Sequence, residues 1–328
     1  MTMRRLASGI LGLLLFLTSS VASATATQWP QAGRVIQAIV PSQAGTGIGN
    51  SVARLVFEAL SERLGNRIVL QHYTSSTGFP SMPPAADTGT EGYTLLFASV
   101  DTLVIEPGLQ RTATLPTHQA FEPIGLVAES PHVVVVNNDL PVHSVRELTD
   151  YISRYPGVVH FGSSGNGSSL HLAGEAYLSA TGTNMVHVPY SAAEPATNNL
   201  VSGDIQAMFQ VTSGVLNYVR AHKVRALAVM APQRSPALPE IPSMAEAGYP
   251  DLTAARWYAL LAPGGTPREI IEKYNAALND ALESPELRDK LLELGVTPLG
   301  GTPAQLGQFL ALETRKWHAT IKEAHLNR

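Results

Sequence analysis

Short apolar runs alternate with amphipathic segments along most of the chain. Residues 35–40 form an apolar run that Pro41 ends, and residues 52–60 place apolar side chains on one helical face. The first pattern is typical of buried strands and the second of helices. Further strands are predicted at 68–70, 93–98, 133–136, 160–162, 185–188, 205–209 and 226–230. This order predicts an α/β protein with mainly parallel sheets.

Capping residues mark several helix ends. Ser144 and Glu147 form a capping-box pair, and Gly182 is expected to end a helix over 170–180. Three pairs in the C-terminal quarter place a hydroxyl before a proline, which predicts three consecutive helices. These pairs are Thr266-Pro267, Ser284-Pro285 and Thr302-Pro303.

The length of 328 residues predicts about two domains. Candidate hinges lie near 127–133 and 254–262, so the chain is expected to cross between lobes twice. A lobe joined to its neighbour by two crossings suits closure around a ligand. The predicted division gives lobe 1 as 27–128 plus 257–328, and lobe 2 as 129–256.

Charge and cysteine content exclude several classes of protein. The net charge is −4 and charged residues make up 15% of the chain. A nucleic-acid-binding protein needs a basic face, so no nucleic-acid partner is expected. The chain has no cysteine, which excludes disulfides, thiolate nucleophiles and cysteine-ligated metals.

The N-terminal segment has the order of a cleavable signal peptide. Arg4 and Arg5 precede an apolar run over 6–17, and small residues follow. We expect a signal peptide over 1–26, with cleavage after Ala24 or Ala26 and export of the mature protein. The alternative is an uncleaved anchor, but the run is shorter than the roughly 20 residues that span a bilayer.

The loop over 162–169 is the most informative stretch for ligand binding. It lies between a predicted strand and a predicted helix, where free backbone N–H groups favour an anion. Glycines allow close approach, serine hydroxyls add donors, and the loop has no basic residue. The loop therefore suits a carboxylate, although a plain helix cap and turn would look the same. Its candidate ligand-binding residues are Ser163, Ser164, Gly165, Asn166 and Ser168.

A second loop of this kind precedes the helix predicted over 52–60. Its candidate residues are Gly45, Thr46, Gly47 and Asn50. Asn50 stands where a dinucleotide fingerprint needs its third glycine, and the Gly-Lys-Ser/Thr ending of a phosphate loop is missing. No cofactor is therefore expected. Two anion-binding loops, one in each lobe, could hold the two ends of a dicarboxylate.

Tests for an enzyme give no complete set of catalytic residues. Ser164 follows Gly162 with the right spacing for a nucleophile elbow, but Asn166 replaces the second glycine. His171 and Glu175 could share a helix face, but a metal would need a third ligand. We therefore expect no metal and no catalytic residues, with a secreted hydrolase as the less favoured alternative. Tyr190 either closes a pocket or is an ordinary strand-end aromatic.

Many short segments together resemble one family of proteins. Two of these segments contain candidate residues named above: 163–175 contains His171, and 186–190 ends at Tyr190. The chain resembles the tripartite tricarboxylate transporter substrate-binding proteins, also called the Bug family, over nearly all of its length after residue 26. The segments are 39–41, 91–96, 163–175, 186–190, 224–229, 234–239, 245–248, 263–267 and 300–303.

The resemblance implies a fold, a function and partners. The expected fold is a two-lobed, type II-like periplasmic binding protein with a ligand cleft between the lobes. The expected ligand is a small organic acid: a di- or tricarboxylate or an aromatic carboxylate. It would be delivered to tripartite tricarboxylate transporter permease subunits, or alternatively sensed by a partner kinase. A monomer is expected, and the ligand-binding set then also includes Ser99, His171, Tyr190 and Gln210.

Two positions depart from the family pattern in a way that bears on the ligand. Asn50 and Gln210 stand where the family usually has acids. A ligand ammonium would lose a counter-charge and a carboxylate would lose repulsion. This predicts a ligand without a free amine. Asp101, if it lines the cleft, would work against that prediction.

Overall fold

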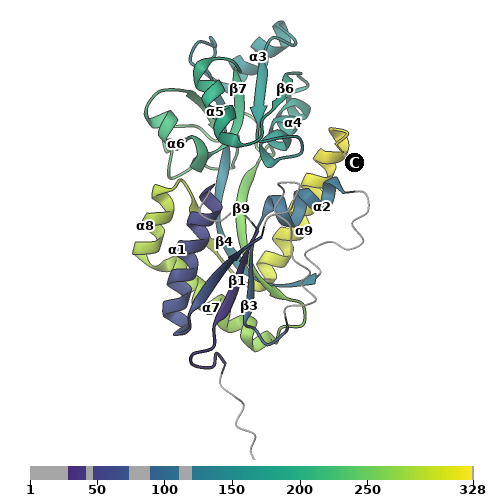
Figure 1. The fold of residues 1–328 in the computed structure, drawn as a ribbon. Coiled ribbons are helices and arrows are strands. Elements are labelled where there is room, and N and C mark those ends of the chain that lie inside the picture. The colour runs from purple at the N-terminus through teal and green to yellow at the C-terminus, as the bar shows by residue number, and fades with distance from the viewer. Residues whose placement is uncertain (1–28, 42–46, 74–88, 111–119, 327–328) are drawn as a thin grey trace, which may run out of the picture.

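Two lobes joined by two long strands make up the molecule, as Figure 1 shows. The computed structural model describes residues 29–41, 47–73, 89–110 and 120–326. The predicted signal peptide lies outside these residues. The joining strands are β4 (Phe121–Val136) and β9 (Ala255–Pro263).

The first lobe, drawn below the second in Figure 1, combines residues from both ends of the chain. Its strands lie in the order β2-β1-β3-β9-β4, and β10 also pairs with β4. The strands are β1 (Ile36–Val40), β2 (Ile68–His72), β3 (Thr94–Ser99) and β10 (Thr297–Gly300). The helices are α1 (Gly47–Leu64), α2 (Glu106–Leu109), α7 (Arg268–Glu283), α8 (Pro285–Glu293) and α9 (Pro303–Glu323). A π-helical turn, η2 (Asp101–Ile105), runs directly into α2.

The second lobe is built from the middle of the chain. Its strands lie in the order β4-β7-β5-β6, and β8 also pairs with β4. The strands are β5 (His160–Ser163), β6 (Val186–Pro189), β7 (Ala207–Val211) and β8 (Arg225–Val229). The helices are α3 (Val145–Arg154), α4 (Ser169–Thr181), α5 (Ala193–Ser202) and α6 (Thr212–Arg220).

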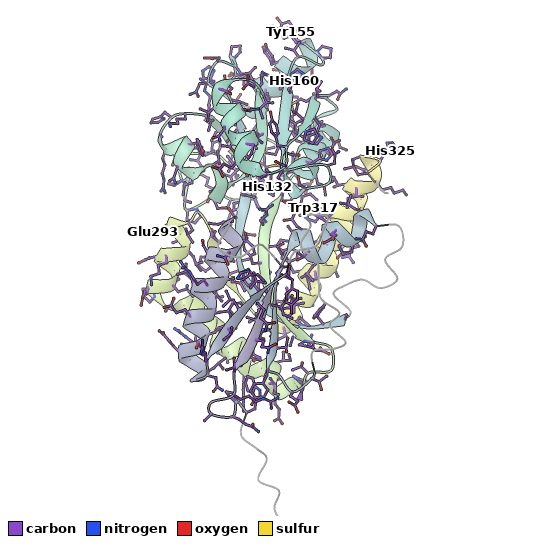
Figure 2. The ribbon with its side chains drawn as sticks, in the orientation of Figure 1. His132, Tyr155, His160, Glu293, Trp317 and His325 are labelled. Atoms are coloured by element: carbon purple, nitrogen blue, oxygen red, sulfur yellow. The ribbon has the colours of Figure 1, made fainter. Side chains whose placement is uncertain are left out.

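β4 belongs to both lobes, and it changes partners in mid-strand. From Phe121 to Pro131 it pairs with β9, and from His132 to Val136 it pairs with β7 and β8. His132 therefore lies where the two lobes meet (Figure 2). The strand crossing falls inside the hinge segment expected at 127–133.

The direction of pairing separates the lobe strands from the crossing strands. β1 is parallel to β2 and β3, and β5 is parallel to β6 and β7. Each antiparallel pair among the described strands involves β4 or β9. The expectation of mainly parallel sheets thus holds within each lobe, and the sheet as a whole is mixed because the chain crosses out on β4 and returns on β9.

Alternating side chains on the buried strands face different cores. Val133 and Val135 join the core under α5 and α6, whereas Val134 and Val136 join the core under α3 and α4. In the first lobe, Ile36 and Val40 face a core covered by α1, α7 and α8. The core under α3 and α4 continues into the first lobe beneath α9, so one apolar layer runs through the junction.

Most of the predicted caps are present. Ser144 accepts from the Glu147 amide, Gly182 ends α4 in the left-handed conformation, and Thr302 forms a capping box with Gln305. The cap expected at Thr266 is wrong, because its hydroxyl donates to Pro263 O and α7 begins only at Arg268.

Membrane-spanning character is absent from the described helices. None of them combines the length and the hydropathy that crossing a bilayer requires.

Candidate functional site

A cavity of about 260 Å³ lies between the lobes and against the crossing strand β9. Ligand pockets usually measure roughly 300–1,000 Å³, so this cavity suits a small molecule. The second lobe contributes Ser164, Gly167 and Ser168, and β9 contributes Arg256 and Tyr258. The rest of the lining comes from the first lobe: Val40, Pro41, Gly49, Phe97, Ala98, Ser99, Asp101, Thr102, Ile105 and Glu106.

The second-lobe wall is the loop between β5 and α4. Ser168 caps α4 and accepts from the His171 amide at 3.3 Å. Gly167 is left-handed, with φ +78°, and a Cβ there would lie 2.6 Å from Cδ1 of Leu109 on α2. A larger residue at Gly167 would therefore have to displace the Leu109 side chain or separate the two lobes at this point.

Ser163 is fully buried and supports this loop from behind. Its hydroxyl accepts from the Gly165 amide at 3.1 Å and donates to Gly165 O at 3.0 Å. His187 Nε2 lies 2.7 Å from the same oxygen, so the imidazole N–H supplies that bond. Because the hydroxyl proton is held by Gly165 O, the pair is not arranged as a nucleophile and its base.

His171 stacks on His187 beneath the loop. Their ring centroids are 3.7 Å apart and their planes differ by 7°. Nδ1 of His171 accepts from the Gly167 amide at 3.0 Å, and Nε2 lies 3.2 Å from Glu175 Oε1. Burial, and secondly the neighbouring His171, lower the pKa of His187 to about 4. The pair thus holds the loop in place from outside the cavity.

Several other predicted residues lie away from the cavity lining. Asn166 is exposed, and Gly165 forms the turn behind Ser164. Tyr190 accepts from Asn199 through its hydroxyl at 2.8 Å. Gln210 is buried, donates to Thr197 Oγ1 at 3.0 Å and accepts from the Val211 amide. Their direct contact with a ligand stays a prediction.

The first-lobe loop is described only in part. Gly45 and Thr46 lie outside the described residues. Gly47 begins α1 with φ +73°, and Gly49 lines the cavity close to the Tyr258 ring. Asn50, one residue further, is not part of the lining. Among the predicted residues, the structure therefore brings together Ser99, Ser164 and Ser168 at the cavity.

The cavity is also lined by charged residues that were not among the candidate ligand-binding residues of the sequence analysis. Nε of Arg256 lies 3.1 Å from Oδ2 of Asp101, and Nη2 of Arg256 donates to Ser169 Oγ at 3.1 Å. The Ser169 amide donates to Oδ1 of Asp101 at 3.3 Å. The available signal was an arginine within the otherwise apolar segment 254–262.

Glu106 is the second acidic residue of the lining. It is half-buried at the start of α2, and it makes no hydrogen bond or ion pair with the described residues. Burial, and secondly the charge of Asp101, raise the pKa of Glu106 from 4.5 to about 7.

These acids correct the expectation of a ligand without an amine. That expectation rested on neutral side chains at Asn50 and Gln210, and neither lines the cavity. Asp101 and Glu106 do line it. The argument against an amine therefore loses its basis.

The fold and the cavity define a class of protein before any sequence comparison. Two α/β lobes, joined by two strands with a pocket between them, are the arrangement of periplasmic solute-binding proteins. Comparison with known proteins agrees. Residues 52–326 match the model of a protein family described as "Tripartite tricarboxylate transporter family receptor".

Individual relatives extend this comparison. BugT of Bordetella pertussis (strain Tohama I) is 32% identical over 326 residues, which covers 98% of each chain. A solved R. palustris protein with adipate is 29% identical, with a TM-score of 0.76 over 91% of this chain and 99% of that one. MatC from Rhodopseudomonas palustris with bound malate is 25% identical, with a TM-score of 0.72 over 88% and 99%.

The chain therefore belongs to the tripartite tricarboxylate transporter receptor family. This family consists of substrate-binding receptors rather than enzymes.

Proposed function

We propose that this protein is an extracytoplasmic receptor that binds a small organic carboxylate in the cavity and delivers it to a permease of the tripartite tricarboxylate transporter type. The observation that carries the proposal is the cavity itself. It is lined from both lobes and from β9, so a ligand inside it contacts both lobes.

The proposed carboxylate site lies against the second-lobe loop. Ser164 has no hydrogen-bond partner among the described residues, so its hydroxyl is available to a ligand. Ser168 and the start of α4 add polar groups and the positive end of the helix dipole. Arg256 lies next to this wall, where its charge is paired with that of Asp101.

Relatives support this ligand class. The R. palustris neighbours are described with adipate and with malate. By the same reasoning we place the mature protein in the periplasm after removal of residues 1–26, as a monomer. The proposed lobes are 27–128 with 257–328, and 129–256.

Binding to residues 27–328 tests the proposal. The protein is first unfolded in guanidinium and refolded by dialysis, so that any bound molecule is removed. Its melting temperature is then measured with adipate, malate, citrate, aromatic carboxylates and amino acids. A ligand at about 100 times its Kd stabilises by about 2.7 kcal/mol, which gives a clear shift. Failure of every carboxylate to bind, or turnover of a bound one, would contradict the proposal.

A serine substitution locates the site. Ser164→Ala should cost about 1.5–3 kcal/mol of binding energy if the hydroxyl bonds the charged carboxylate directly. Ser153→Ala is the matched control, because Ser153 is exposed on α3 in the second lobe and away from the cavity lining. Equal affinity of both variants would move the site away from this loop.

A further inference from the structure

The two walls of the cavity differ in charge. The second-lobe wall offers neutral donors in the hydroxyls of Ser164 and Ser168. The first-lobe wall presents two acids, Asp101 and Glu106. A ligand that spans the cavity therefore meets donors at one end and carboxylates at the other.

The charge of Asp101 is already compensated. One of its oxygens is paired with Arg256 at 3.1 Å, and the other accepts from the Ser169 amide at 3.3 Å. Arg256 in turn donates to Ser169, so the positive charge is shared within this cluster. The cluster is closed on itself and leaves no net charge for the ligand to neutralise.

Glu106 has no such compensation from the part of the chain that the structure describes. It is half-buried in the lining, and none of the described residues hydrogen-bonds to it or forms an ion pair with it. A carboxylate that leaves bulk water without a partner is costly, and a second carboxylate beside it adds repulsion. A dicarboxylate in a cavity of about 260 Å³ would bring its far end close to Glu106.

We propose that the ligand is a small carboxylate that also carries an ammonium group, and that Glu106 is the residue that selects the ammonium. This inference rests on the proposed receptor function. The carboxylate of the ligand faces Ser164 and the start of α4, and its ammonium faces Glu106. The ligand thereby supplies a positive charge that the described first-lobe lining of the cavity does not provide.

Probes of equal length separate this ligand class from plain acids. Calorimetry compares 6-aminohexanoate with adipate and hexanoate, and 4-aminobutanoate with succinate and butanoate. Common α-amino acids are also tested, because their ammonium and carboxylate groups are closer together and the cavity decides which spacing of the two charges binds. The wild-type protein should bind an amino acid of this panel at least tenfold more tightly than the dicarboxylate of the same length.

Glu106→Gln tests the selecting residue. The change is isosteric and breaks no described contact, so folding should be retained, as circular dichroism would verify. The preferred amino acid should lose at least tenfold in affinity, and the matching dicarboxylate should gain. Glu240→Gln removes the same charge at an exposed position outside the cavity lining and should change neither affinity.

The outcomes distinguish this inference from the proposed function. Tight binding of a carboxylate without an amine, with the same preference in Glu106→Gln, would overturn the ammonium proposal and leave the receptor function standing. Binding of no carboxylate, with or without an amine, would overturn both.

Discussion

The Asp101–Arg256 ion pair joins the first lobe to a strand that crosses between the lobes. Nε and Oδ2 lie 3.1 Å apart, and each side chain is only 22% exposed. Ser169, the first residue of α4 in the second lobe, hydrogen-bonds to both partners. Three parts of the molecule thus meet at one charged cluster beside the cavity.

Removal of one charge from this pair should destabilise the protein. Asp101→Asn keeps an acceptor for the Ser169 amide but leaves Arg256 without a counter-charge. We expect a loss of about 1–3 kcal/mol in the free energy of unfolding, measured with urea. A double-variant cycle with Arg256→Gln isolates the pair, and a coupling energy below about 0.5 kcal/mol would show that the two charges act independently.

Ser163 and Ser164 are neighbours with opposite predicted roles. Ser163→Ala removes the partner of the Gly165 amide and of His187, and each orphaned buried group costs about 1–3 kcal/mol of stability. Ser164→Ala breaks no bond between described residues, so it should change stability by less than about 0.5 kcal/mol. Chemical unfolding of both variants checks this, and equal losses would contradict the division of roles.

Glu106 should make stability fall as the pH rises. Its pKa is raised from 4.5 to about 7 in the folded protein, by burial and then by Asp101. Between these two pH values the folded state binds more protons than the unfolded state, so the free energy of unfolding declines as the pH rises through the window. Relative to Glu106→Gln, the wild-type melting temperature should therefore drop between pH 5 and pH 8. Parallel curves for the two proteins would contradict this.

His132 should have the opposite effect at the acid side. It is fully buried, neither ring nitrogen has a described partner, and burial, followed by Arg256, lowers its pKa from 6.5 to about 3. Below pH 6.5 the unfolded state binds more protons, so stability falls as the pH falls toward 3.

His132→Leu should weaken this acid dependence. The substitution removes an unpartnered polar ring and leaves the backbone bonds to Ala254 and Met230 in place. Melting temperatures at pH 7 and pH 4.5 give the comparison. A variant that is less stable at pH 7 and equally sensitive to acid would show that the ring makes a favourable polar contact.

Gly167 provides a test of contact between the lobes. A Cβ at Gly167 would lie 2.6 Å from Leu109, whereas a Cβ at Gly182 would meet nothing within 4 Å. Both residues have positive φ, so Ala at either position carries a similar backbone cost. Gly167→Ala should weaken ligand binding at least tenfold, and Gly182→Ala should leave affinity unchanged. Similar affinities would show that closure does not bring Gly167 against Leu109.

Sequence patterns predicted the elements inside each lobe better than the crossings between them. The run at 133–136 was read as a short strand, yet β4 extends from Phe121 through Pro123 and Pro131. Proline usually ends a strand because it has no N–H to donate. Whether a proline is tolerated within β4 depends on which strands pair with it at that residue. The local sequence pattern carries no information about those pairing strands.

The candidate site likewise combines residues that local sequence patterns selected with residues that they did not. Helix-start chemistry selected Ser164 and Ser168 as candidate ligand-binding residues, and both line the cavity. It did not separate them from Ser163, the last residue of β5, whose side chain turns inward to His187. Glu106, at the start of α2, and Arg256, on β9, line the same cavity although they lie 150 residues apart in sequence.

The paired crossing of β4 and β9 limits the motions open to the lobes. The two strands pair from Phe121 and Pro263 to Pro131 and Ala255, with two shifts of register between Pro123 and Ala128. Sliding one strand along the other would break many backbone bonds at once, whereas bending the two-stranded ribbon keeps them. The lobes can therefore rotate about a fixed spacing but cannot separate along the ribbon, and any partner that distinguishes open from closed must sense an angle rather than a distance.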